Sequence, residues 1–220
     1  MNNIRIWFQK SDAAAYISHL DLVRCMTRAV RRAALPLWYT EGFNPHPYLT
    51  FPLPLPLGQS GLCEPMDLRI LDETTPQKLL AMLAPVMPQG IAVTAVSEPQ
   101  MDAKEIAAAQ YDLTLTFADA AKANSFTEAA QTLLAGNSLP AEKKSKKGII
   151  TVNLCEMMRD FSIETADCTA VLHCTLAAGN TTNLNAALLA NTLLAAAGLD
   201  CVLMEIARLR LLNADLAEFR

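Results

Sequence analysis

The segment from 19 to 33 constrains the fold most, because its apolar residues recur at the spacing of an α-helix. At about 100° per residue, one arc of this helix is apolar and the opposite arc is charged. The apolar arc holds Leu22, Val23, Met26, Ala29, Val30 and Ala33. The charged arc holds Asp21, Arg24, Arg28, Arg31 and Arg32. One face of the helix must therefore be buried, and the sequence predicts that it packs on other secondary structure.

The first half of the chain predicts alternating strands and helices. The predicted elements are a strand at 4–8, a helix from 19 that is capped by Ser18 and ends before Pro36, an extended segment at 48–57, a strand at 64–71, a helix at 76–84 and a strand at 90–96. Pro52, Pro54 and Pro56 remove N–H donors from one edge of the extended segment, which is typical of an edge strand. The predicted order is βαββαβ.

The second half predicts the same order with one extra short strand. The predicted elements are strands at 111–117, 149–154, 161–165, 170–176 and 202–211, and helices at 126–135 and 183–197, each followed by a glycine. The sequence therefore predicts an α+β protein of two ferredoxin-like (βαββαβ) units with antiparallel sheets. We expect the units at residues 1–98 and 110–220, the second with a lysine-rich loop.

Charge is concentrated in two basic islands, although the chain has a net charge of -4. One island is the arginine arc of the first helix. The other is the loop around 142–147, which holds Lys143, Lys144, Lys146 and Lys147. Guanidinium groups suit phosphate and carboxylate oxygens, so the islands are candidate binding sites for an anionic ligand such as RNA. The alternative is a solvated helix face, and the sequence leaves both interpretations open.

A proline-stiffened loop follows the first helix. His46 lies between Pro45 and Pro47, and this rigidity suits a residue that contacts a ligand. Tyr39 and Phe43 are candidates for stacking on bases, and Asn44 is a candidate for reading a base edge. For Phe43 the favoured interpretation is a core side chain.

His19 begins the helix, and a catalytic pair of His19 with His46 is an alternative hypothesis. No nucleotide-binding loop, hydrolase elbow or diagnostic pair of carboxylates occurs, so an enzyme is not favoured. The six cysteines form no CxxC pair, which is typical of reduced thiols in the cytoplasm. Cys168, His173 and Cys174 lie at or just before the predicted strand at 170–176, but the neighbours 173 and 174 point to opposite faces, so we expect no metal site and no cofactor.

Two further patterns concern localisation. The N-terminus lacks the features of a signal peptide. The most apolar segment, 184–199, is shorter than the ~20 residues that a membrane span needs. We therefore expect a cytoplasmic protein without a membrane partner.

Several motifs of the first 70 residues resemble a known bacterial family. The matching segments are Ile17-Ser18-His19-Leu20-Asp21-Leu22, Arg28-Ala29-Val30-Arg31-Arg32-Ala33, Leu35-Pro36-Leu37, Gly42-Phe43-Asn44-Pro45-His46-Pro47 and Leu53-Pro54-Leu55-Pro56-Leu57-Gly58. They resemble the radical-SAM-linked proteins of the DUF2344 type. The chain departs from that pattern at Asn153, where an acidic residue is expected, and at Asn183, where a proline-containing helix start is expected.

The resemblance implies association with a radical SAM enzyme, with this chain as the part that presents substrate. The chain has no CxxxCxxC motif and would be an accessory module. The leading hypothesis is therefore a non-catalytic module that binds RNA or presents substrate to a radical SAM partner. The alternatives are a metal-independent RNA-processing or RNA-modifying enzyme that uses His19 and His46, and a purely protein–protein adaptor.

Overall fold

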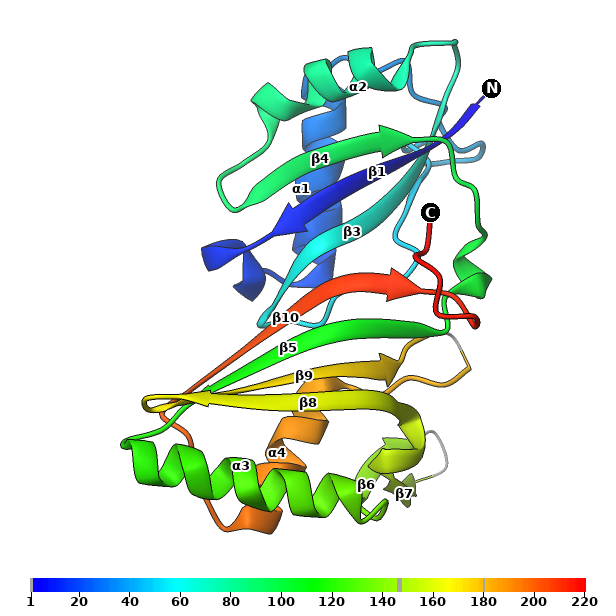
Figure 1. The fold of residues 1–220 in the computed structure, drawn as a ribbon. Helices are drawn as coiled ribbons and strands as arrows, with labels where there is room; N and C mark the ends of the chain where they lie inside the picture. Colours follow the sequence, from blue (N-terminus) through cyan, green and yellow to red (C-terminus); the bar gives the residue numbers. More distant parts are fainter. Residues whose placement is uncertain (1, 146–147, 180) are drawn as a thin grey trace. The chain divides into compact units, whose positions relative to one another are not determined.

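The computed structural model describes residues 2–145, 148–179 and 181–220 (Figure 1). Its contacts divide the chain into two compact units. The first comprises Met1–Ile106 with Glu218–Arg220, and the second comprises Ala107–Ala217. Each unit combines an antiparallel sheet with helices, which confirms the predicted α+β class.

The sheet of the first unit is built around β1 (Asn2–Lys10), which pairs with both β3 (Gln59–Ile70) and β4 (Ile91–Ser97). The short strand β2 (Leu49–Thr50) pairs with β3. All pairs are antiparallel, and the order across this unit is β4-β1-β3-β2.

Two α-helices, α1 (His19–Arg32) and α2 (Pro76–Leu83), supply the core of the first unit. Alternate residues of β1, including Ile4, Ile6 and Phe8, point to one face and pack in the same cluster as apolar residues of both helices. The helical members of that cluster are Leu22, Met26 and Val30 of α1, and Leu79 and Leu83 of α2. Figure 1 shows α1 crossing behind the strands.

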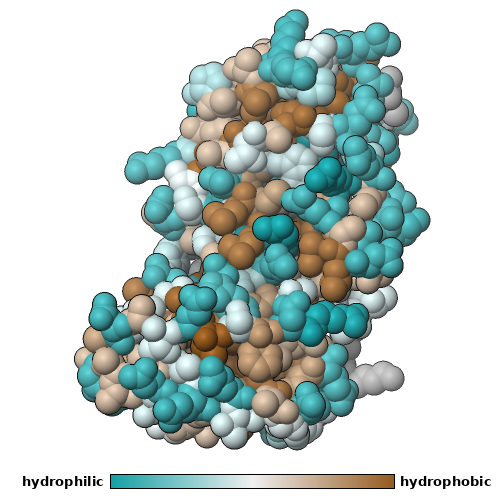
Figure 2. Space-filling view, in the orientation of Figure 1, coloured by the Kyte–Doolittle hydropathy of each residue, from teal (hydrophilic) through white to brown (hydrophobic). Residues whose placement is uncertain are grey.

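The opposite face of this sheet holds a buried arginine. Arg5 is 1% exposed and donates through Nε and Nη2 to the Asp67 carboxylate at 2.7 and 2.8 Å. Nη2 also donates to the Met101 carbonyl at 3.0 Å, and the guanidinium lies 4.2 Å from the centre of the Phe219 ring. Arg5 thus ties β1 and β3 to the returning C-terminal residues. In Figure 2, apolar and polar side chains are interspersed over the strands of this unit.

The second unit has the same arrangement of four strands. Its strands are β5 (Ala108–Thr116), β8 (Met158–Ala166), β9 (Thr169–Ala177) and β10 (Leu203–Leu212), with helices α3 (Ala120–Ala135) and α4 (Ala186–Ala197). The order across the unit is β10-β5-β9-β8. In chain order, both units therefore place the fourth strand beside the first, then the third and the second. Between α3 and β8, the strands β6 (Pro140–Ser145) and β7 (Gly148–Asn153) form a hairpin.

Local signals predicted the helix ends well. The Ser18 hydroxyl accepts from the Asp21 N–H at the start of α1, and Gly198 ends α4 with a φ of +67°. The predicted helix at 126–135 is α3, which begins earlier because Asp119 caps it. The helix predicted from 183 begins at Ala186, after its cap Asn185.

Two strand predictions need correction. The segment at 48–57 is a strand only at Leu49–Thr50, because the three prolines that follow cannot donate to a partner strand. The lysine-rich segment was predicted as a loop, but Lys143 and Lys144 lie in β6. Charged residues at 142–144 interrupt the alternation of apolar residues along this strand, so periodicity does not reveal it.

Among the helices of the described residues, none combines the length and the hydropathy that a bilayer crossing requires.

Candidate functional site

Three of the four predicted arginines line one groove. Arg24, Arg28 and Arg32 recur every four residues along α1, about 6 Å apart along its axis. The groove has a volume of about 370 Å³, and we call it the arginine groove. Its other lining residues are Asp21, Cys25 and Ala29 from α1, and Val86 and Pro88 from the segment after α2. The structure therefore assembles a cationic wall opposite apolar residues.

Most of this positive charge is not neutralised within the protein. Arg24 Nη1 lies 3.1 Å from Asp21 Oδ1, and both side chains are exposed. The Ser18 hydroxyl, and then Arg24, lower the pKa of Asp21, so this carboxylate is ionised beside the groove. Within the described residues, Arg28 and Arg32 form no ion pair with an acidic side chain. They remain available to an anion from outside.

Cys25 also lines the groove. Burial raises the pKa of the Cys25 thiol, whereas the charges of Arg28 and Arg32 oppose that shift. Cys25 is therefore a neutral thiol rather than a competing anion. Of the residues that line the groove, only Asp21 supplies a counter-ion to the three guanidinium groups.

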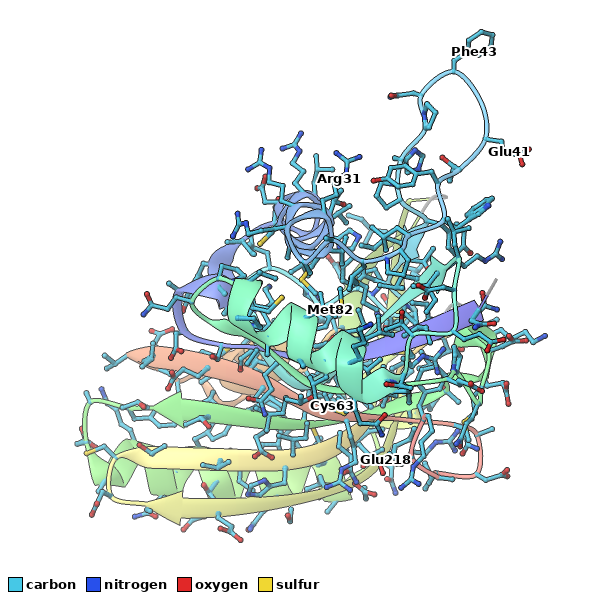
Figure 3. The ribbon with its side chains drawn as sticks, turned by 90° about the horizontal axis from the view of Figure 1, so that it is seen from above. Arg31, Glu41, Phe43, Cys63, Met82 and Glu218 are labelled. Carbon is cyan, nitrogen blue, oxygen red and sulfur yellow. The ribbon has the colours of Figure 1, made fainter. Side chains whose placement is uncertain are left out.

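Arg31 belongs to a different surface from the other three arginines. Its guanidinium lies 5.8 Å from the centre of the Tyr39 ring, at the base of the loop that follows. In Figure 3, Arg31 points outward from α1, on the side where the loop carrying Glu41 and Phe43 projects. The predicted arginine arc is thus divided between the groove and this loop.

The loop at residues 40–46, which we call the finger, stands on a braced stalk. Backbone bonds close the stalk, from the Thr40 N–H to the His46 carbonyl at 2.9 Å and from the Tyr48 N–H to the Trp38 carbonyl at 3.1 Å. The Arg69 guanidinium lies 5.4 Å from the Trp38 ring centre and 4.3 Å from the Tyr48 ring centre. These contacts hold the two sides of the loop together.

Phe43 lies at the tip of the finger, and the expectation of a core side chain is wrong. Its accessible surface is 111% of the reference value, and Figure 3 shows it projecting into solvent. The core of this unit is filled instead by residues of the sheet, both helices and Leu35 and Leu37. Gly42, with a φ of +123°, provides the turn that places Phe43 at the tip.

His46 braces the finger from within. Its Nδ1 atom lies 3.1 Å from both the Asn44 carbonyl oxygen and the Thr40 hydroxyl. The backbone N–H of His46 donates to the Thr40 hydroxyl at 3.2 Å. His46 therefore has contacts within the loop while it remains exposed, as Phe43 does at the tip.

The structure does not bring His19 and His46 to a common contact. His19 begins α1 and packs edge-on against Phe51, with ring centres 5.2 Å apart. His46 belongs to the finger, whose base lies beside Arg31 in the last turn of α1. The helix is about 20 Å long, so the two imidazoles are associated with opposite ends of it.

The lysine island lies in the second unit. Lys143 and Lys144 belong to β6, and Lys146 and Lys147 lie outside the described residues. Asn153 braces the base of this hairpin, because its Oδ1 accepts from the Leu139 N–H at 2.9 Å and its Nδ2 donates to the Asn137 carbonyl at 3.0 Å. An acidic residue, which the family pattern predicts here, has no N–H for the second bond.

A polar row across the second sheet was missed by sequence reasoning. Ser162, His173 and Asp112 are register partners on the neighbouring strands β8, β9 and β5. His173 Nδ1 lies 2.6 Å from Asp112 Oδ1, with 39% and 30% of the two side chains exposed, beside a hollow of about 300 Å³. Strand pairing over 61 residues creates this contact, and no local motif signals it.

The same region bears on metal binding. Among the described residues, no group of three or more His, Cys, Asp and Glu side chains is placed to hold a metal ion. Burial, with the nearby charges of Asp160 and Asp112, raises the pKa of Cys174 to about 12. Cys174 is therefore a protonated core thiol at neutral pH.

Comparisons with known proteins add the family. No curated protein matches the chain in sequence. Among solved structures, the chain is similar to the crystal structure of an unknown protein from Galdieria sulphuraria, with 10% identity, coverage of 94% of this chain and 98% of that chain, and a TM-score of 0.27. A family model described as an uncharacterised protein conserved in bacteria matches residues 3–186, which include the arginine groove and the finger. The chain therefore belongs to the DUF2344 family.

Proposed function

We propose that this protein is a non-catalytic accessory module that binds RNA, with the phosphates held in the arginine groove. The observation that carries the proposal is the stripe of Arg24, Arg28 and Arg32 along one groove, of which only Arg24 has an acidic partner within the described residues. Forked guanidinium groups bind phosphate oxygens in pairs and stay charged at every physiological pH.

A comparison inside the molecule supports a functional origin of the stripe. Helix α3 holds the place in the second unit that α1 holds in the first, because each connects the first strand to the second. Its charged residues are Lys122 and Glu128 alone. Covering a sheet therefore requires no cationic stripe. Like charges four residues apart destabilise a helix by roughly 0.2–0.5 kcal/mol per pair, and a bound anion would offset this cost.

The architecture and the partner are parts of the same proposal. The shared strand order supports two ferredoxin-like units, each with its strands in the order fourth, first, third, second. The family resemblance suggests a radical SAM enzyme as the partner to which this module presents its substrate. Copurification of an iron–sulfur enzyme with the full chain at low ionic strength would support that assignment.

The test of RNA binding is the salt dependence of affinity. For a fluorescent single-stranded RNA, we expect Arg28→Ala with Arg32→Ala to weaken binding about 100-fold at low salt, at about 1.4 kcal/mol per contact. The slope of log K against log salt should fall by about 1.4, because two phosphate contacts are lost and each contributes about 0.7 for a single strand. The matched control is Lys122→Ala on α3, which should change neither quantity. Unchanged affinity in the double variant would refute the proposal.

Two outcomes favour the alternative functions. Binding of an acidic peptide but not RNA, lost in the same double variant, would favour a protein–protein adaptor. RNA turnover that is lost in His46→Ala while RNA binding persists would favour a processing enzyme.

A further inference from the structure

We propose that the finger is a docking element for a partner protein, in which Phe43 enters an apolar pocket and Glu41 meets a basic group at the rim of that pocket. This surface is separate from the arginine groove and differs from it in chemistry. The inference goes beyond RNA binding, because it assigns the protein a second binding surface.

The exposure of Phe43 is the first observation. Within the described part of the chain, no other large apolar side chain is exposed to the same degree, and the next is Val202 at 72%. Burying a phenylalanine side chain in an apolar pocket removes a large apolar surface from water and so favours binding. Aromatic side chains that enter a partner's pocket commonly dominate the energy of an interface. The finger therefore presents a single large apolar anchor.

The bracing of the finger is the second observation. Thr40 and His46 bond across the loop through both backbone and side chain, and the Asn44 carbonyl lies against the same imidazole. Pro45 and Pro47 restrict the backbone further. Because these contacts order the loop before binding, docking loses little conformational entropy. An exposed tip on a pre-ordered support is suited to insertion.

The charge of the finger indicates a protein rather than RNA. Residues 40–46 contain one formal charge, the carboxylate of Glu41, and no lysine or arginine. Glu41 is exposed, and in Figure 3 it projects from the side of the finger, below the tip that carries Phe43. A phosphate backbone would be repelled by this carboxylate, whereas a lysine or arginine at the rim of an apolar pocket would pair with it.

The test uses a photo-crosslinking phenylalanine analogue at position 43 of the full chain, expressed in its native cells. The matched position is Tyr16, an aromatic residue of the same unit that is 68% exposed. We expect one crosslinked protein from position 43 and none from position 16. Mass spectrometry should place the crosslink in an apolar pocket bordered by lysine or arginine, and Glu41→Lys should abolish it.

Three results would overturn the inference. They are crosslinks to RNA, crosslinks to a second copy of this chain, and no product above the position 16 control. With the crosslinked partner purified, Phe43→Ala should weaken binding at least 10-fold while Tyr16→Ala leaves it unchanged. Equal affinities of these two variants would also overturn the inference.

A parallel measurement separates this inference from the proposed function. Phe43→Ala should leave RNA affinity unchanged, whereas the arginine double variant should lose it. If Phe43→Ala weakens RNA binding as strongly as the double variant, the finger belongs to the RNA surface and the inference is wrong. If no RNA binds but the specific crosslink persists, the RNA proposal fails and the docking finger stands.

Discussion

The two units share a strand order but differ in what they attach to it. In each unit, the connection between the first helix and the second strand of the sheet carries an additional element. This element is the finger between α1 and β2 in the first unit, and the β6–β7 hairpin between α3 and β8 in the second. The finger displays an aromatic tip, whereas β6 contains Lys143 and Lys144. The two units therefore share a scaffold, and the same connection carries an apolar aromatic side chain in the first unit and basic residues in the second.

The open faces of the two sheets differ as well. In the first unit, the Arg5 guanidinium is buried against the returning C-terminal residue Phe219, and its partner Asp67 is 22% exposed, whereas Asp112 and His173 of the second unit are 30% and 39% exposed beside a hollow. Equivalent strand positions thus support an ion pair with a buried guanidinium in one unit and an accessible polar pair in the other. Removing the carboxylate of Asp67 in one variant and that of Asp112 in another therefore tests this contrast.

The largest expected effect comes from Asp67→Ala. Removing this carboxylate leaves the buried guanidinium of Arg5 without its counter-ion, and its Nη1 has no hydrogen-bond partner among the residues that the structure describes. We expect a loss of about 3–5 kcal/mol in the free energy of unfolding. Urea unfolding monitored by tryptophan fluorescence measures it, because both tryptophans, Trp7 and Trp38, lie in the first unit.

The matched variant is Asp112→Ala, which removes the carboxylate from His173. Its expected cost is only about 0.2–1 kcal/mol, because the pair is half-exposed. Amide exchange of β9 measures this loss in the second unit. Equal costs for the two variants would contradict the distinction between a covered and an open face.

The next comparison concerns the hydrogen bonds that hold the β6–β7 hairpin and the finger in place. Asn153→Asp removes the donor to the Asn137 carbonyl and places a carboxylate beside that oxygen, so we expect a loss of about 1–3 kcal/mol. Thr40→Val removes the hydroxyl that accepts from the His46 N–H, with an expected loss of about 1 kcal/mol. Hydrogen exchange should show faster opening of only the connection that carries the substitution. Faster exchange throughout a unit would show that the connection is not an independent addition.

The helix caps test whether α1 and α3 are equivalent as scaffold. Ser18→Ala and Asp119→Ala each remove a side chain that accepts from the N–H three residues later, and each should cost about 1 kcal/mol. Chemical denaturation of the single variants measures both losses. A large cost at one cap alone would show that the two helices contribute differently to their units.

The smallest effect concerns the ionisation of Asp21 beside the arginine groove. Its pKa is lowered, first by the Ser18 hydroxyl and then by Arg24. The resulting stabilisation is therefore present above the ordinary pKa of an aspartate and is lost as the pH falls through the lowered value. In an NMR titration, Ser18→Ala should raise the pKa of Asp21 more than Arg24→Gln does. The reverse order would assign the shift mainly to the guanidinium.

Much of the fold was predictable because it depends on local patterns. Alternation of apolar residues located β1, and helical periodicity with Ser18 at its start located α1. The strand β6 was missed because its charged residues at 142–144 leave no alternation of apolar residues along it. The proline-rich segment at 48–57 was overextended because its composition suggests a strand while its missing N–H groups prevent pairing.

The candidate site was predicted in part. Helical geometry alone placed Arg24, Arg28 and Arg32 on one face, but only the packing of Val86 and Pro88 opposite them made a groove. The roles of Phe43 and His46 were assigned by residue type, and the structure shows Phe43 at the surface and His46 within the brace. A loop's direction depends on contacts at its stalk, which lie outside the motif itself.

By itself, the sequence determined the helices, most strands and the cationic face of α1, because periodicity, caps and breakers act over a few neighbouring residues. Only the tertiary structure decided that Arg5 meets Asp67, that His173 meets Asp112 and that Phe43 faces solvent. These outcomes depend on strand register and on contacts between distant segments, which no short stretch of sequence encodes.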